Sequence, residues 1–298
     1  MKYPSEINFR EETDGVSVCY KDSPEVKYNL DIWAISYLLN KGLYSVHKEN
    51  VIHLDAIDIS RPMWLTMGLR LYFLSKFQVF KNISFDIKNV DEINVKVEDI
   101  VKNVGKTDKY ITYSDPEDFS SRGTKSHPES RLEKYISENL SGVFGTEFSG
   151  SNKVIRQFPA NIFEDEINEK ARITRKFWID ILAVNNFNQL SVIELKAGAN
   201  CPLDILIQAL DYGIYCHLFK KHIADCFFDK VPLLDKNKIA IYCVAENFHP
   251  GLMGRNGIKG VLSLILKNKL FDLVLLGIKT KGDKVEGKPV VVYDSRLE

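Results

Sequence analysis

Two short apolar segments of the sequence carry charged residues where hydrophobic side chains are expected. The segment from Phe177 to Val184 reads FWIDILAV, with Asp180 as its one charged residue, and the segment around Glu194 and Lys196 reads SVIELKAG. Alternate residues of a β-strand point to the same face, so Glu194 and Lys196 are expected to point the same way. Two carboxylates and an ammonium group in apolar surroundings are typical of acid–base or metal-assisted chemistry.

The two segments are predicted to form neighbouring antiparallel strands, because only the short turn NNFNQ separates them. This pairing brings Asp180 close to Glu194. Nearby carboxylates raise each other's pKa, and burying them unpaired is costly, so a divalent cation between them would relieve both penalties. An isolated Glu-x-Lys lies more often at an exposed strand end, with the aspartate bonding a loop. The combination of both strands favours the metal site.

Asp180 on one strand and Glu194-Leu195-Lys196 on the next resemble the motif of the PD-(D/E)XK nuclease superfamily, which has a restriction-endonuclease-like fold. The resemblance implies that Asp180 and Glu194 bind Mg²⁺, or Mn²⁺ in its place, with help from the backbone carbonyl of Leu195. It also implies that Lys196 positions or activates the attacking water. Such a metal polarises the phosphate and lowers the pKa of its bound water. The expected activity is hydrolysis of phosphodiester bonds in DNA, with RNA as the alternative substrate.

The helix predicted from about Leu203 to Lys221 is apolar nearly all round and is expected to be buried. Gln208 and Tyr212 lie four residues apart on one of its faces. They match the Gln-x-x-x-Tyr motif of RecB-like nucleases, which implies that they orient the lysine or contact the nucleic-acid strand. Alternatively, Gln208 bonds the backbone and Tyr212 fills the core with its hydroxyl at the rim.

The helix predicted from about Glu129 to Leu140 offers a further acid. Superfamily members often carry an acidic residue here that reaches the metal, and Glu129 fits that place, with Glu133 as the second choice. Ser126-x-x-Glu129 is equally well explained as a capping box at the helix N-terminus. Basic residues nearby are interpreted either as phosphate contacts or as a solvated surface: Lys153, Arg156, Arg172, Arg175 and Lys176.

The polar stretch from Ser114 to Pro128, SDPEDFSSRGTKSHP, is predicted to separate two domains. Domain 1–120 is expected to be α/β or α+β, with substrate or partner recognition as its role. Its predicted strands lie near 16–20, 51–57 and 83–87, and its helices near 31–39 and 63–77. Domain 125–298 is predicted to be an α/β mixed sheet flanked by helices. Its predicted strands lie near 154–163, 177–184, 190–196, 239–245, 273–278 and 290–293, with another helix near 258–267.

The composition limits the partners. The 298 residues are 45% hydrophobic, which suits a globular protein, and 40 basic residues balance 40 acidic ones. Any contact with nucleic acid must therefore come from a local patch. The five cysteines show no Cys-x-x-Cys pair, and no secretion signal or membrane span is recognised, so a cytoplasmic protein without a membrane partner is expected.

Three functional classes remain open. The first is a nuclease whose partner is DNA. The second is a nucleic-acid-binding or scaffold module that keeps the nuclease fold without turnover. The third is an enzyme that uses the same acids on another phosphate ester. A homo-oligomer is compatible with each of them.

Overall fold

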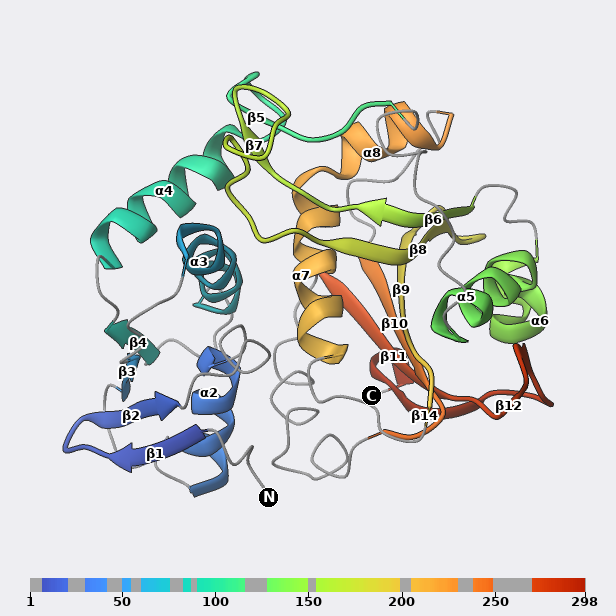
Figure 1. Cartoon of the computed structure of the whole chain (residues 1–298), viewed down its shortest axis with the longest axis horizontal. Helices are drawn as coiled ribbons and strands as arrows, with labels where there is room; N and C mark the ends of the chain where they lie inside the picture. The colour runs from blue at the N-terminus through green and yellow to red at the C-terminus, as the bar shows by residue number, and fades with distance from the viewer. Residues whose placement is uncertain are drawn as a thin grey trace. The chain divides into compact units, whose positions relative to one another are not determined.

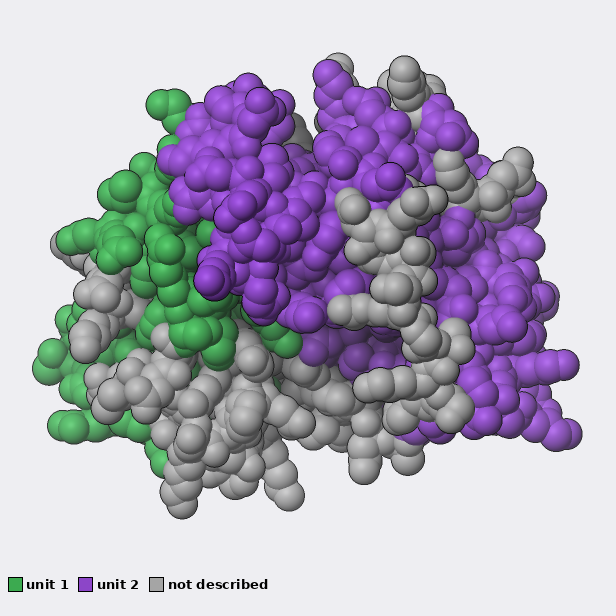
Figure 2. All heavy atoms as spheres, turned by 45° about the horizontal axis from the view of Figure 1, so that its top comes forward, with its two compact units in different colours: residues 1–102, 173–175, 250–268 green, residues 103–172, 176–249, 269–298 purple. Residues whose placement is uncertain are grey.

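The computed structural model describes residues 7–20, 30–41, 50–54, 60–75, 83–86, 90–115, 128–149, 154–198, 205–229, 238–248 and 270–297. The chain forms two compact units, coloured separately in Figure 2. Unit 1 comprises residues 1–102, 173–175 and 250–268, and unit 2 comprises 103–172, 176–249 and 269–298. Unit 1 thus ends its first segment before the expected boundary at 114–128, of which 116–127 lie outside the described residues. No helix in the described ranges has the length and apolar character needed to cross a membrane.

Unit 1 contains a four-stranded sheet in the order β1-β2-β3-β4. Strands β2, β3 and β4 are parallel, and β1 is antiparallel to β2. Parallel neighbours need a crossover, and the helices between successive strands supply it. The elements are β1 (Ile7–Glu11), β2 (Gly15–Tyr20), α2 (Leu30–Lys41), β3 (Asn50–Leu54), α3 (Arg61–Ser75), β4 (Ile83–Asp86) and α4 (Val90–Asn103). The sequence indicated these strands and helices except β1 and α4.

A buried ion pair joins α2 to α3. The Arg70 guanidinium donates to both carboxylate oxygens of Asp31, at 2.7 and 2.9 Å, and both side chains are fully buried. A buried charge is tolerated only when it is paired and hydrogen-bonded, so each residue depends on the other.

The main sheet of unit 2 has the order β14-β11-β10-β9-β8-β6. Strands β9, β10 and β11 are parallel, whereas β6, β8 and β14 each run antiparallel to a neighbour. The expected mixed α/β sheet is therefore confirmed. Its strands are β6 (Val154–Pro159), β8 (Trp178–Val184), β9 (Leu190–Lys196), β10 (Ile239–Ala245), β11 (Phe271–Gly277) and β14 (Val290–Asp294).

Helices cover both faces of this sheet (Figure 1). The core on one face joins α5 (Pro128–Glu138) and α6 (Leu140–Phe144) to side chains that include Ile193 and Tyr242. Helix α7 (Ile205–Leu218) connects β9 to β10 and packs on the opposite face. It approaches closely at Gly213, where an added Cβ would lie 2.7 Å from Ile241 Cδ1. Strands β8 and β9 therefore lie between two layers of helices.

The remaining elements of unit 2 are short. They are β5 (Tyr110–Ile111) paired with β7 (Phe163–Glu164), β12 (Thr280–Lys281) paired with β13 (Lys284–Val285), α8 (Lys220–Phe227), and the 3-10 turns η4 (Gly145–Phe148) and η5 (Ser295–Leu297). Three predicted elements of unit 2 differ from their expected bounds by more than one or two residues. The helix near 129–140 is interrupted at Asn139, whose ψ of 34° is not helical, and the helix near 203–221 divides into α7 and α8. The strand near 154–163 ends as β6 at Pro159, and the helix near 258–267 lies outside the described residues.

Side-chain hydrogen bonds hold the turn between β8 and β9. Asn185 Oδ1 accepts from the backbone N–H groups of Phe187 and Gln189, both at 3.0 Å, as Asx-turns do. Gln189 in turn donates to Asp272 on β11. The turn of the predicted hairpin is therefore fixed by its asparagine.

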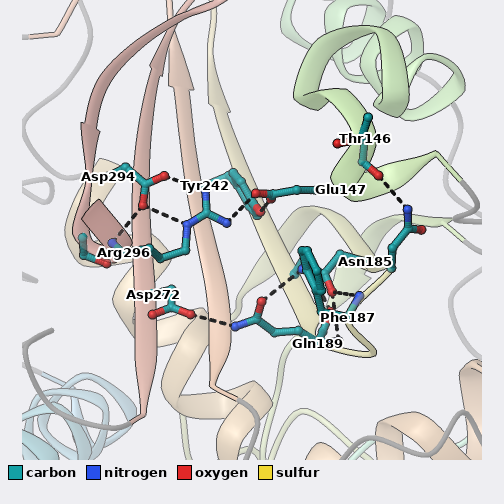
Figure 3. A network of polar contacts seen from close by, with 12 residues as sticks. Thr146, Glu147, Asn185, Phe187, Gln189, Tyr242, Asp272, Asp294 and Arg296 are labelled. Carbon is teal, nitrogen blue, oxygen red and sulfur yellow. Dashed lines mark hydrogen bonds and ion pairs between the residues drawn. The ribbon is translucent and has the colours of Figure 1, made fainter. Parts of the chain in front are cut away.

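A second polar network, drawn in Figure 3, connects η5 to η4 and β10. Glu147 of η4 accepts from the Tyr242 hydroxyl at 2.6 Å and from Arg296 at 2.7 Å. Arg296 also pairs with Asp294. These contacts join η4, β10 and the segment after β14.

Candidate active site

The paired stretch of β8 and β9 stops just before the candidate acids. It runs from Val184 opposite Leu190 to Ile181 opposite Ile193. One position further along, the same register places Asp180 opposite Glu194. Residues that face each other across antiparallel strands point to the same side of the sheet. Asp180 and Glu194 therefore share one side, at the point where the two strands separate.

Asp180 is held from two directions. Its side chain is 8% exposed, and its Oδ2 accepts from the backbone N–H of Leu195 at 2.9 Å. Its Oδ1 accepts from Gln157 Nε2 at 3.3 Å. Gln157 lies on β6 between the residues that pair with Ile181 and Ile179, and its φ of 50° falls in the left-handed region that non-glycine residues rarely adopt. Such strain costs about 1–3 kcal/mol and is concentrated at functional sites.

Glu194 forms an ion pair with Lys196. Lys196 Nζ lies 2.7 Å from Glu194 Oε1 and 3.6 Å from Glu129 Oε1 on α5. Glu194 is 2% exposed, and its Oε2 is buried without a hydrogen-bond partner. A buried, unsatisfied carboxylate oxygen is costly, so this atom is suited to accept a ligand.

Burial and neighbouring charges control the ionisation of this group. Burial, followed by the charge of Glu194, raises the pKa of Asp180 well above its ordinary value. Burial also raises the pKa of Glu194, although the Lys196 ammonium opposes the rise. Burial alone would lower the pKa of Lys196, but the charges of Glu194, Asp180 and Glu129 outweigh it and raise the pKa. Lys196 therefore stays cationic, while the two acids bind protons more tightly than free carboxylates.

Both candidate acids of α5 reach this group, at different points. Glu129 lies beside Lys196, as described above. Glu133 is 2% exposed and accepts from Arg156 Nε at 2.9 Å and from Gln157 Nε2 at 2.6 Å. Gln157 thus bridges Glu133 to Asp180. Burial raises the pKa of Glu133, against the hydrogen bonds from Gln157 and Arg156.

Ser126, the other half of the predicted capping box, lies outside the described residues. Helix α5 begins at Pro128, a residue suited to a first helical position because that position needs no backbone donor. The capping box of Ser126 and Glu129 therefore stays a prediction. The contact between Glu129 and Lys196 is observed.

The oxygen donors around Asp180 meet the needs of a small divalent ion only together with water or substrate oxygens. Among the described residues, no three His, Cys, Asp or Glu side chains are grouped so that they could hold a metal by themselves. Magnesium commonly takes only one or two carboxylates and keeps several waters or phosphate oxygens. Asp180 and Glu194 fit such a site, because both are oxygen donors and Glu194 Oε2 is available. Leu195, whose carbonyl was expected to help, is fixed through its N–H to Asp180.

Gln208 and Tyr212 lie on α7, which packs against β9 and β10. Tyr212 is buried, and its ring meets Phe177 edge-on with centroids 5.4 Å apart, next to the start of β8. This contact agrees with the core-filling alternative for Tyr212. Gln208 is half-buried, and its role in orienting the lysine stays a prediction.

The basic residues named from the sequence are partly engaged within the protein. Arg156 is bound by Glu133 and by the Ser130 carbonyl, and Arg172 pairs with Glu169. Lys153 lies outside the described residues. Sequence reasoning missed Gln157 and the lysines of the β12–β13 hairpin. The four lysines were visible in the sequence as one short segment, KTKGDKVEGK, although its two short strands were not.

Comparison of the sequence with models of known protein families and with curated proteins found no match. The chemistry of this chain is therefore inferred from the side chains that converge near Asp180. They comprise a central pair of acids, a cation bound to one of them, and two further acids supplied by α5.

Proposed function

We propose that unit 2 is a metal-dependent nuclease that hydrolyses phosphodiester bonds of DNA, with RNA as the alternative substrate, and uses Mg²⁺ or Mn²⁺ as its cofactor. One observation carries the proposal. Two buried carboxylates, Asp180 and Glu194, occupy facing positions where β8 and β9 separate, and Lys196 is bound to the second of them. A hydrophobic sheet retains such a costly group most readily when a ligand offsets its charge.

The proposal includes a restriction-endonuclease-like core that resembles the PD-(D/E)XK superfamily. Helix α5, the antiparallel strands β6, β8 and β9, the crossover helix α7 and the parallel strand β10 follow one another in the chain. This order supports the proposal. It places the Asp180 strand between the strand of Gln157 and the strand of Glu194.

Each residue of the group is assigned a role. Asp180 and Glu194 would hold the ion, with Glu129 and the Leu195 carbonyl as further donors. When bound, the ion would polarise the phosphate and lower the pKa of its water. Lys196 keeps its proton, because its pKa is raised, and so acts as a fixed positive charge beside the developing negative charge. Gln208 and Tyr212 would orient that lysine from α7.

A binding or scaffold module without turnover is the alternative. One observation favours it. Both Asp180 oxygens already accept hydrogen bonds, from Leu195 and Gln157, so a metal must displace or share at least one of them. The unpartnered Glu194 Oε2 favours the nuclease instead.

The test is cleavage of single-stranded DNA, duplex DNA and RNA, with magnesium and with chelator. Asp180→Asn, Glu194→Gln and Lys196→Met are each expected to lower magnesium-dependent cleavage by about 100-fold or more. The matched control is Asp272→Asn, another buried acid of the same sheet that is bound by Lys238 and Gln189. It should keep its activity. In parallel, calorimetry should detect magnesium binding that Asp180→Asn removes.

Two results would count against the nuclease. Cleavage that survives in all three site variants would remove these residues from the chemistry. Magnesium binding and oligonucleotide binding without any cleavage would leave the binding module as the better description.

A further inference from the structure

A lysine-rich hairpin lies between β11 and β14 in unit 2. Strand β12 pairs with β13, with Thr280 opposite Val285 and Lys281 opposite Lys284. The two-residue turn has Gly282 at φ 63°, a conformation that glycine adopts without strain. A backbone bond from Glu286 N to Lys279 O, 2.8 Å long, closes its base. The hairpin is therefore a defined element with a fixed register.

One anchor connects the hairpin to the segment that follows Lys196. The Thr280 hydroxyl donates to Glu246 Oε1, and Glu246 Oε2 accepts from the backbone N–H of Gly198 at 2.7 Å. Gly198 follows Lys196 by two residues. Glu246 thus ties the first strand of the hairpin to the end of β9.

A second anchor connects the hairpin to α5. Arg131 Nε lies 2.9 Å from Asp283 Oδ1 in the turn, and Arg131 follows Glu129 by two residues. Val285 also packs against the core that includes Leu132 of α5. The hairpin is therefore attached to both segments that supply the candidate site, the one with Lys196 and the one with Glu129.

The charge of the hairpin is positive and accessible. Lys279, Lys281, Lys284 and Lys288 are exposed, whereas one of the two local acids, Asp283, is already paired with Arg131. Within the described ranges, no ion pair involves any of these four lysines. The whole chain has no net charge, so attraction to a polyanion must come from such a patch.

The pairing of Lys281 with Lys284 is unfavourable without a ligand. Directly opposite residues of an antiparallel pair point to the same face, and like charges there repel. An anion bound across both ammonium groups would convert this repulsion into attraction. The arrangement therefore favours a partner with closely spaced negative charges.

We propose that the β12–β13 hairpin binds the sugar–phosphate backbone of a nucleic acid and presents it to the group around Asp180. This inference rests on the proposed function for the identity of the partner. The attachment of the hairpin to the segments of Lys196 and Glu129 carries it, together with the facing lysines. The hairpin contributes binding of the substrate, and the acids contribute the chemistry.

The experiment measures binding of a fluorescent oligonucleotide, duplex and single-stranded, by anisotropy in chelator over a range of salt concentrations. Lys281→Gln/Lys284→Gln is compared with Lys102→Gln/Lys106→Gln, two exposed lysines outside the hairpin. Each lost phosphate contact lowers the slope of log affinity against log salt by about 0.9 for duplex and about 0.7 for single strands. The hairpin variant should lose close to two such contacts, and the control variant none. Neither variant should have a lower melting temperature than the wild type.

The outcomes separate this inference from the nuclease proposal. Equal salt slopes for the hairpin variant and the wild type would overturn the hairpin's role, even when cleavage is observed. Binding that depends on the hairpin without magnesium-dependent cleavage would support the hairpin and count against the nuclease. Absence of oligonucleotide binding by the wild type, or binding of inorganic polyphosphate alone, would overturn the inference.

Discussion

Replacing Glu194 with glutamine should stabilise the metal-free protein at neutral pH. The wild-type side chain is almost fully buried, is repelled by the charge of Glu129, and has no hydrogen-bond donor at Oε2 among the described residues. The amide keeps the shape and an oxygen for Lys196 but carries no charge. Glu194→Gln therefore removes an electrostatic cost while retaining the packing.

The expected gain is about 1–3 kcal/mol at pH 7. The gain comes from the removed charge, because the glutamine NH2 group takes the buried place of Oε2, and each tenfold change in acid dissociation corresponds to about 1.4 kcal/mol. Loss of the Lys196–Glu194 attraction offsets part of the gain, but Lys196 keeps Asp180 and Glu129 as nearby opposite charges. In a unit of this size, each kcal/mol shifts the melting temperature by about 2–4 °C.

The gain should depend on pH in a defined direction. The pKa of Glu194 is raised in the folded protein above its ordinary value of 4.5. Below that value the acid is protonated in both states, and its ionisation does not affect stability. As the pH rises through and above it, the unfolded chain releases a proton that the folded chain retains, so the wild-type free energy of unfolding falls. The free energy of unfolding of Glu194→Gln does not fall in this way. The difference in stability between the variant and the wild type should therefore increase above about pH 4.5.

Urea denaturation from pH 4 to pH 8 in chelator measures this difference. Asp272→Asn serves as the control, since its carboxylate is paired with Lys238 and Gln189 and gains nothing from neutralisation. Magnesium should then stabilise the wild type but not Glu194→Gln, by an amount that grows with ligand concentration. A variant less stable than the wild type at pH 7, or a gain that does not change with pH, would refute this reasoning.

Two further substitutions test the interior of each unit separately, Arg70→Leu in unit 1 and Gly213→Ala in unit 2. Arg70→Leu removes the guanidinium that pairs with the buried Asp31 carboxylate, so urea denaturation should show a loss of about 3–5 kcal/mol. Replacing both residues with leucine should recover much of it, and a double variant as unstable as the single one would contradict this. Gly213→Ala places a methyl group 2.7 Å from Ile241 Cδ1 and 3.2 Å from the Phe271 ring, so thermal denaturation should show a loss of about 1–3 kcal/mol. A more stable variant would mean that the helix propensity of alanine, about 1 kcal/mol, outweighs the clash.

Strands β8, β9 and β10 were predictable because their sequences are almost continuous apolar runs. Strands β9 and β10 have the predicted bounds, and β8 differs by one residue at its start. The turn between β8 and β9 was also predictable, because Asn185 makes a local turn possible without distant partners. Local propensity and burial agree in these segments, so the sequence alone was sufficient.

The contacts of the helix acids and of Gln157 could not be predicted. Glu129 and Glu133 lie one helical turn apart, and only the path of α5 over the sheet places one beside Lys196 and the other beside Gln157. The left-handed backbone of Gln157 could not be expected from the sequence, because glutamine, unlike glycine or asparagine, rarely adopts a positive φ. The two-residue strands of the β12–β13 hairpin are too short for periodicity to reveal them.

The bond from the Leu195 amide to Asp180 offers a direct spectroscopic observable. The amide proton of Leu195 is hydrogen-bonded to a carboxylate side chain rather than to a backbone carbonyl. Its chemical shift and its exchange with solvent therefore depend on the charge of that carboxylate. Protonation of Asp180, or its capture by a cation, would weaken the bond and move the resonance. Nitrogen-15 spectra of a labelled sample could therefore follow the state of Asp180 through one backbone signal, without any added probe.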